Sequence, residues 1–419
     1  MLIGSLFEVV SLGAVLPFLG ALIAPEQVFN HSLMQPVIQF FELTDPNQIV
    51  FPLTIIFIAA AVIAGMFRLA QLFITIRLTY ATGADLSINV YHRTLHQDYA
   101  VHVSRNSSEV INGIISKTNT VVTGVIAPIL DLISSAILLV AVMSVLLAIN
   151  ITIALSAFVG FGLIYLVVIR YSRKHLKFNS KLIADQSTQV IKSLQEGLGG
   201  IRDVLIDGSQ QFYCKVFRNA DLPLRRAQGN NSIISGGPRF IIESIGMVLI
   251  AVLAYIMFDQ SEGSITVIPV LGALAVGAQR LLPALQRSYG SYTTIKGSKS
   301  SMEDVIRLLE QPIPGYINNE LEPIPFEKEI VLKNLSFRYT ADTPMVLKDI
   351  NLTLKKGDHI GFIGTTGSGK STLIDVIMRL LVETSGEILV DNQVINNKNR
   401  DEWQAHIAHV PQNIYLSDS

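Results

Sequence analysis

A glycine-rich stretch near the carboxyl end of the chain combines the residue types that bind phosphate. It reads GFIGTTGSGKST over residues 361–372, and its core, Gly364-x4-Gly369-Lys370-Ser371, fits the pattern GxxxxGK[ST]. Glycines let the backbone turn so that its N–H groups converge on phosphate oxygens. A lysine placed there reaches the β- and γ-phosphates, and the serine hydroxyl binds Mg²⁺. The stretch therefore predicts a phosphate-binding loop made of Gly364, Thr365, Thr366, Gly367, Ser368, Gly369, Lys370, Ser371 and Thr372.

The residues around the loop predict the elements that position it. IGFIG enters the loop as a buried strand would, and STLIDVIMRLL continues it as a helix whose positive amino end faces the phosphates. From Glu329 onward, short β-rich runs alternate with turns such as KKGD at 355–358. A chance glycine-rich turn is the alternative, and this strand–loop–helix context argues against it.

Two further side chains fit a nucleotide site. Tyr339 lies 25 residues before Gly364 and could stack on an adenine ring, although an aromatic in the core of a strand is the alternative. Gln412 lies 42 residues after Lys370, where its amide could reach Mg²⁺ or a water bound to it. A glutamine in a loop is common, so Gln412 alone is weak evidence.

The composition indicates a membrane protein. Half of the 419 residues are hydrophobic and 16% are charged, against about a quarter in soluble domains. The net charge of -1 gives no basic field for nucleic acid, and a single cysteine, Cys214, excludes an internal disulfide framework.

Apolar runs of membrane-spanning length occur six times, which excludes a soluble enzyme with a phosphate loop. They are residues 2–24, 51–76, 121–149, 151–169, 240–258 and 265–285. Lysine and arginine are absent from the connectors 25–50 and 259–264 but frequent in 77–120 and 170–239. Because basic connectors stay in the cytoplasm, the long connectors and the phosphate loop are expected on that side.

The long connectors are expected to extend the spans as helices. NSKLIADQSTQVIKSLQEGL, residues 179–198, is rich in helix formers with apolar residues three and four apart. An ordinary helical hairpin is one interpretation, and a pair of levers reaching a motor domain is the other. We expect a helical membrane domain over 1–300, a proline-containing linker over 301–326 and a nucleotide-binding domain from 327 to 419.

Taken together, these features resemble an ABC exporter half-transporter. The phrases FEVVSLGAVLPFL, VHVSRNSSEVI, GGIRDVLIDGSQQFY, GTTGSGKSTLIDVIM and WQAHIAHVPQNIYLSDS are similar to the polysaccharide-associated branch, which includes lipid-linked oligosaccharide flippases. The resemblance implies a multi-domain membrane protein, in which an all-α exporter domain of six helices precedes a partial α/β nucleotide-binding domain. It also implies a bacterial inner-membrane location, ATP and Mg²⁺ as cofactors, and a second half-transporter, as a homodimer, as partner.

The resemblance further implies roles for matched residues. Tyr339 would stack on adenine, Lys370 and Gln412 would serve catalysis, and Ser371 and Gln412 would hold Mg²⁺. Short coupling helices would fall near Tyr99–Ser107 and Gly208–Phe217. The family's LSGGQ-type signature, Asp–Glu pair and switch histidine do not occur in these residues, and Met1 directly precedes the first apolar run. We therefore expect a fragment that does not hydrolyse ATP by itself, although the full-length protein would.

Arginines in or beside the apolar runs suggest where a cargo could bind. Arg68, Arg239 and Arg280 lie in the inner halves or at the inner ends of their runs, where guanidinium groups could bind a lipid pyrophosphate. The alternative is that Arg239 reaches the membrane interface, and that Arg68 or Arg280 pairs with Glu8, Asp131 or Glu243. The expected function is thus export of a lipid-linked oligosaccharide or other lipid. Export of general lipids, drugs or peptides, and an ATP-gated regulator that transports nothing, remain alternatives.

Overall fold

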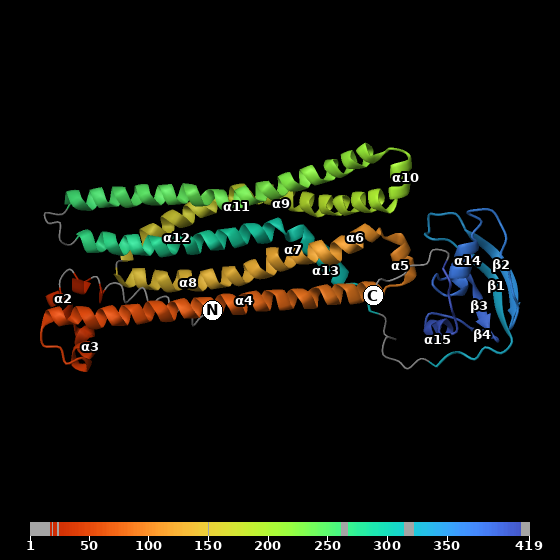
Figure 1. The fold of residues 1–419 in the computed structure, drawn as a ribbon, viewed down its shortest axis with the longest axis horizontal. Helices are drawn as coiled ribbons and strands as arrows, with labels where there is room; N and C mark the ends of the chain where they lie inside the picture. Colours follow the sequence, from red (N-terminus) through yellow and green to blue (C-terminus); the bar gives the residue numbers. More distant parts are fainter. Residues whose placement is uncertain are drawn as a thin grey trace. The chain divides into compact units, whose positions relative to one another are not determined.

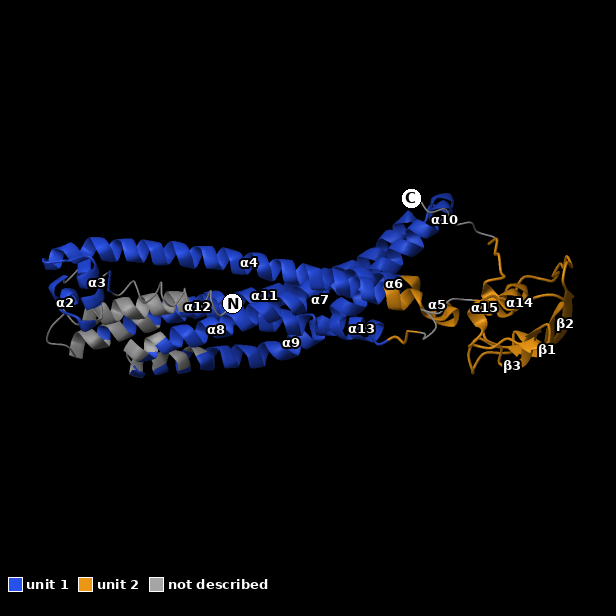
Figure 2. Ribbon diagram, turned by 90° about the horizontal axis from the view of Figure 1, so that it is seen from below, with its two compact units in different colours: residues 1–91, 108–310 blue, residues 92–107, 311–419 orange. Residues whose placement is uncertain are grey.

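The computed structural model describes residues 17–18, 20–22, 25–149, 151–260, 267–313 and 322–411. They fall into two compact units, residues 1–91 with 108–310 and residues 92–107 with 311–419 (Figure 2). The apolar run 2–24 and the turn at Asn150 lie mostly or wholly outside the described residues. The two units are described separately below.

The first unit is built from helices, several of them very long (Figure 1). They are α2 (Pro25–Phe29), α3 (Gln35–Phe40), α4 (Val50–Leu95), α6 (Ser107–Asn112), α7 (Thr118–Val121), α8 (Ala127–Ile149), α9 (Ile151–Gly199), α10 (Ile201–Ile206), α11 (Gln210–Gln260), α12 (Val267–Gly297) and α13 (Lys299–Leu309), with short 3-10 or π turns at 32–34, 46–49, 113–117 and 122–126.

Several helices are longer than the apolar runs that they contain. At 1.5 Å per residue, the 49 residues of α9 and the 51 of α11 extend well past a hydrocarbon core of about 30 Å. The predicted helix at 179–198 is confirmed as the last part of α9. Within the described residues, two helical stretches are long and apolar enough to cross a bilayer, Pro46–Leu95 and Ser107–Ser144. The other span boundaries remain predictions.

Polar contacts join the long helices to one another. Helix α9 packs along α11, and α12 packs on α8, α9 and α11. Between α9 and α11, the Asn179 amide donates to Asn231 at 2.8 Å. The Tyr289 hydroxyl of α12 donates to the Ile234 carbonyl at 2.9 Å and lies 3.0 Å from the Ser172 hydroxyl. Such bonds help to fix the register between these long helices.

The short helices predicted near Tyr99–Ser107 and Gly208–Phe217 are only partly where the sequence placed them. Helix α5 (Tyr99–Ser104) begins at the predicted Tyr99 but ends before Ser107. The prediction of Gly208–Phe217 for the second was wrong in position, because the short helix is α10, Ile201–Ile206. Gly208 has a φ of +66°, a left-handed value that ends helical structure and starts the turn into α11.

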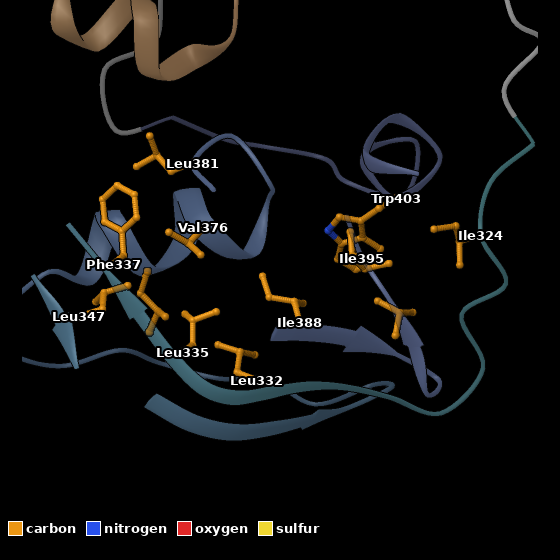
Figure 3. Close-up of a cluster of buried hydrophobic side chains, with 12 residues drawn as sticks. Ile324, Leu332, Leu335, Phe337, Leu347, Val376, Leu381, Ile388, Ile395 and Trp403 are labelled. Carbon is orange, nitrogen blue, oxygen red and sulfur yellow. The ribbon is translucent and has the colours of Figure 1, made fainter. Parts of the chain in front are cut away.

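A four-stranded antiparallel sheet forms the second unit, which also contains α5. Its strands are β1 (Glu329–Phe337), β2 (Leu347–Lys355), β3 (Ser385–Val390) and β4 (Gln393–Val394), in the order β2-β1-β3-β4. Helices α14 (Lys370–Ile377) and α15 (Arg400–Gln404) complete it. Leu332, Ile388 and Val376 meet Trp403 and Ile395 in one buried core (Figure 3).

Two predictions for the elements beside the loop were wrong. The described residues 360–364 form no strand, and Ile363 is 99% exposed. A strand needs a neighbour to pair its backbone, and the four described strands pair only with one another. The predicted helix begins as expected but ends at Ile377, since Arg379 adopts a left-handed φ of +60°.

Gly386 permits the closest backbone approach in the sheet. Its φ is +89°, and a Cβ atom there would lie 2.6 Å from the carbonyl carbon of Asn334 in β1. Gly386→Ala should therefore lower the free energy of unfolding of this unit by about 2–3 kcal/mol. Thermal unfolding followed by Trp403 emission measures the change. Gly361→Ala is the matched control, because a Cβ atom there meets nothing within 4 Å, and equal midpoints for the two variants would contradict the argument.

Asp391 ties the start of β1 to the turn after β3. Its carboxylate accepts from the backbone N–H groups of Lys328 and Glu329, each at 2.8 Å, and from that of Glu327. These hydrogen bonds lower the pKa of Asp391, so its stabilisation is present above the unfolded value near ~3.9 and is lost as pH falls through the folded value.

Asp391→Asn should therefore lower the thermal midpoint at pH 7, and the difference from wild type should shrink in acid, below about pH 4. Asp342→Asn, at an exposed loop position, should leave the midpoint unchanged throughout. A wild-type advantage that stays constant down to pH 3 would show that the carboxylate charge is not what stabilises this turn.

Candidate nucleotide site

Lys370 closes the phosphate loop onto the start of α14. Its Nζ donates to the carbonyl oxygens of Gly364 and Thr365, each at 2.8 Å, and lies 3.4 Å from the Ser368 hydroxyl. The loop backbone therefore curls around one ammonium group. This arrangement places a positive charge inside a ring of backbone, which is the electrostatic requirement for binding a polyphosphate.

The loop glycines are needed for conformation. Gly367 and Gly369 have φ values of +85° and +90°, a region that costs free energy for residues with a Cβ atom. At Gly369 a Cβ atom would also lie 3.2 Å from the side chains of Val346 and Leu347. The sequence pattern and the backbone geometry thus agree at this position.

The loop and helix present donors suited to an anion. The Ser368 N–H donates to the Thr365 carbonyl at 3.2 Å, whereas among the described residues the N–H groups of Gly367 and Gly369 meet no protein acceptor. Helix α14 begins at Lys370 and adds the partial positive charge of its amino end. Ser371 has an exposed side chain, so its hydroxyl is available to a cation. These residues fit a magnesium nucleotide, in which Mg²⁺ would neutralise charge on the β- and γ-phosphates.

Tyr339 lies beside the loop. Its hydroxyl is 3.0 Å from the hydroxyl of Thr372, which is buried in the first turn of α14. The ring packs edge-on against Phe337, with centroids 5.1 Å apart, and is 47% exposed. Tyr339 is thus positioned by the core without being buried in it, which leaves ring surface for stacking. Its role with adenine stays a prediction. Gln412 lies outside the described residues.

The far end of α14 is held by residues that sequence reasoning missed. The Trp403 indole N–H donates to the Ile377 carbonyl at 2.9 Å, and the Gln404 amide donates to the Met378 carbonyl at 3.0 Å. Terminal carbonyls of a helix have no partner inside it, so these bonds cap α14. The one tryptophan in the chain was the available signal, since a buried indole N–H nearly always finds an acceptor.

A buried ion pair follows the same helix end. Arg379 is 3% exposed and pairs with Glu383. Burial, and secondarily the nearby charge of Arg400, lowers the pKa of Arg379. Arg400 itself pairs with Asp98 at 2.6 Å and with Asp401 at 3.4 Å. The phosphate-loop helix therefore ends in a cluster of charged groups that reaches the residue preceding α5.

The three arginines of the apolar runs are not seen as one cluster. Arg239 pairs with Glu243, one turn along α11, at 2.8 Å, and the Gln286 amide of α12 donates to the same carboxylate at 3.2 Å. Pairing of Arg68 or Arg280 with Glu8, Asp131 or Glu243 stays a prediction. Arg68 lies in α4, and the side chain of Arg280 is outside what the structure describes.

Family comparisons agree with both parts of the chain. The model of the ABC transporter transmembrane region matches residues 12–275, and that of the ABC transporter matches residues 347–419. The chain belongs to the ABC transporters. ABC transporter proteins of this kind are membrane proteins that bind ATP, and the fold of this one is an exporter-type helical domain followed by a small nucleotide-binding region.

Individual relatives are distant. An ATP-dependent lipid A-core flippase of Cupriavidus pinatubonensis is 21% identical over 85% of this chain, and the matched region is 60% of the flippase. The oligomycin resistance ATP-dependent permease YOR1 of Saccharomyces cerevisiae is 28% identical over 56% of this chain and 16% of its own length. A solved bacterial Atm1-family ABC exporter with ATP bound has a TM-score of 0.69 at 19% identity, covering 96% of this chain and 70% of that one. The chain thus spans about 60% of the flippase relatives.

Two substitutions of Tyr339 distinguish a role in base stacking from a role in hydrogen bonding. Tyr339→Ala should weaken binding of a fluorescent ATP analogue roughly tenfold, because base stacking on an aromatic contributes about 1–3 kcal/mol. Tyr339→Phe keeps the ring and loses only the hydroxyl contact with Thr372, so its dissociation constant should stay within about threefold of wild type. Equal losses in both variants would show that the hydroxyl, rather than the ring, is what matters.

Proposed function

We propose that the chain is the larger part of one subunit of an ATP-driven ABC exporter that moves an amphipathic lipid outward across a bacterial inner membrane. The observation that carries this proposal is the nucleotide site itself. Lys370, closed onto Gly364 and Thr365 and flanked by Tyr339, occurs in the same chain as the matched transmembrane region.

We assign a separate role to each residue of the site. Lys370 holds the terminal phosphates, Ser371 supplies a hydroxyl for Mg²⁺, and Tyr339 stacks on the base. Gln412 follows α15 in the sequence, and we assign it to Mg²⁺ and to signalling toward the membrane domain. Water attack requires groups beyond these, so hydrolysis belongs to the whole protein.

A second copy of the subunit is the proposed partner. Around α10, large apolar side chains project from the first unit, with Leu205, Ile206 and Phe212 each more than 60% exposed. Large exposed apolar residues gathered over a short stretch of chain are typical of an interaction surface. We assign this stretch to the nucleotide-binding domain of the partner subunit.

The cargo proposed is a lipid-linked oligosaccharide or a similar anionic lipid. The names of the flippase relatives support a lipid, and Arg68, Arg239 and Arg280 supply guanidinium groups for phosphate. Arg239 remains 60% exposed while Nε is paired with Glu243, so its other nitrogens can reach a headgroup. The yeast permease relative favours a drug as the second candidate cargo.

Reconstituted vesicles test the proposal directly. The full-length protein should move a fluorescent polyprenyl-pyrophosphate glycan out of the accessible leaflet when ATP and Mg²⁺ are present, and Lys370→Ala should abolish this. Arg239→Ala should reduce flipping at least tenfold, because a charge-assisted contact to phosphate is lost. Arg225→Ala, at a surface ion pair on the same helix, is the matched control and should flip normally.

The possible results distinguish the proposed ATP-driven transport from the proposed identity of the cargo. ATP hydrolysis without movement of the glycan lipid would remove the lipid-linked assignment and leave an exporter of other substrates. Oligomycin-type drug efflux under the same conditions would favour the second candidate. Steady ion conductance with ATP and no cargo movement would favour a regulator over a transporter.

A further inference from the structure

We infer that Arg400 is a positioning residue that couples helix α5 to the phosphate loop, through α15 and the carboxyl end of α14. This inference rests on the proposed function for its biological meaning, although its physical content is a linkage within the second unit. It assigns to Arg400 and Asp98 a route to the site that does not pass through Gln412.

The segment that precedes α5 contacts the rest of the second unit at two places. Arg93 donates to the Gln311 carbonyl at 2.8 Å and Gln97 donates to the Pro312 carbonyl at 2.9 Å, so both hold the chain just after α13. Asp98, the next residue, pairs with Arg400 at 2.6 Å. Residues 93–98 therefore contact both the chain just after α13 and the first residue of α15.

Helix α15 connects these contacts to α14. Arg400 begins α15, and Trp403 and Gln404 at its other end cap the carbonyls of Ile377 and Met378. Helix α15 has only five residues, so both sets of contacts lie within about one and a half turns of helix. A shift of Arg400 is therefore felt at the carboxyl end of α14, whose amino end carries Lys370.

The charge balance around Arg400 makes Asp98 important. Arg400 is 15% exposed at its side chain, and its charge acts on the buried guanidinium of Arg379. Two guanidinium groups near each other require carboxylates, and Asp98, Asp401 and Glu383 surround them. Asp98 is the member of this set supplied from outside the α14–α15 region. Removing it takes away the shorter of the two described carboxylate contacts of Arg400.

Tyr99 brings α5 itself close to the site. Burial raises the pKa of the Tyr99 hydroxyl, with further contributions from Asp375 of α14 and from Tyr339. Tyr99 follows Asp98 directly, so the start of α5 carries one side chain that pairs with Arg400 of α15 and one whose pKa is affected by Asp375 of α14. Three residues join α5 to the end of α4.

A charge-swap cycle tests the linkage. The full-length protein in lipid nanodiscs would be titrated with a fluorescent non-hydrolysable ATP analogue in four forms: wild type, D98R, R400D and the double variant. Each single variant should weaken binding roughly fivefold, and the double variant should return to within about twofold of wild type, since the pair is restored in reverse. Exchange of Lys192 and Glu196 (K192E with E196K), an ion pair on α9, is the control and should change nothing.

The contrary results are equally clear. Losses that multiply in the double variant, or single variants that bind like wild type, would overturn the inference. If R400D fails to fold, D98N and R400Q replace the reversals, and the second substitution should then add no further loss. Because these readouts measure nucleotide binding alone, a failure of lipid flipping would leave them intact and would count only against the proposed function.

Discussion

Helix α14 is held at both of its ends, and the nucleotide site depends on that. At its start Lys370 binds two loop carbonyls, and at its finish Trp403 and Gln404 cap the last carbonyls of the helix. The left-handed Arg379 stops the helix just beyond, in place of the glycine usual at such a position. An eight-residue helix is not stable by itself, so these tertiary bonds fix where its amino end points.

The helical unit meets a different constraint. Helices that cross a bilayer satisfy their own backbone, and their apolar surfaces give little information about register. Register is supplied here by a few side-chain bonds, such as Asn179 with Asn231 and Tyr289 with Ser172. These contacts lie on the long extensions of α9, α11 and α12, where polar residues are tolerated and the helices still pack closely.

The two constraints meet in a short stretch of chain. Helix α4 ends at Leu95, and within three residues the chain binds the linker and the start of α15 through Arg93, Gln97 and Asp98. A transporter needs its energy source and its membrane helices to respond to one another. In this chain these hydrogen bonds and the ion pair are the contacts through which we propose that response.

The sequence determined the features that depend on local pattern: the membrane character, the helix at 179–198, the phosphate loop with Lys370, and the family. Glycine spacing and apolar run length are read without knowing any neighbour. Tertiary structure alone decided that residues 360–364 form no strand, that the second short helix lies at Ile201–Ile206, that Glu243 contacts Arg239 and Gln286, and that Trp403 caps the helix that follows the loop. Each of these depends on which partner lies opposite, and partners distant in sequence leave no local periodicity.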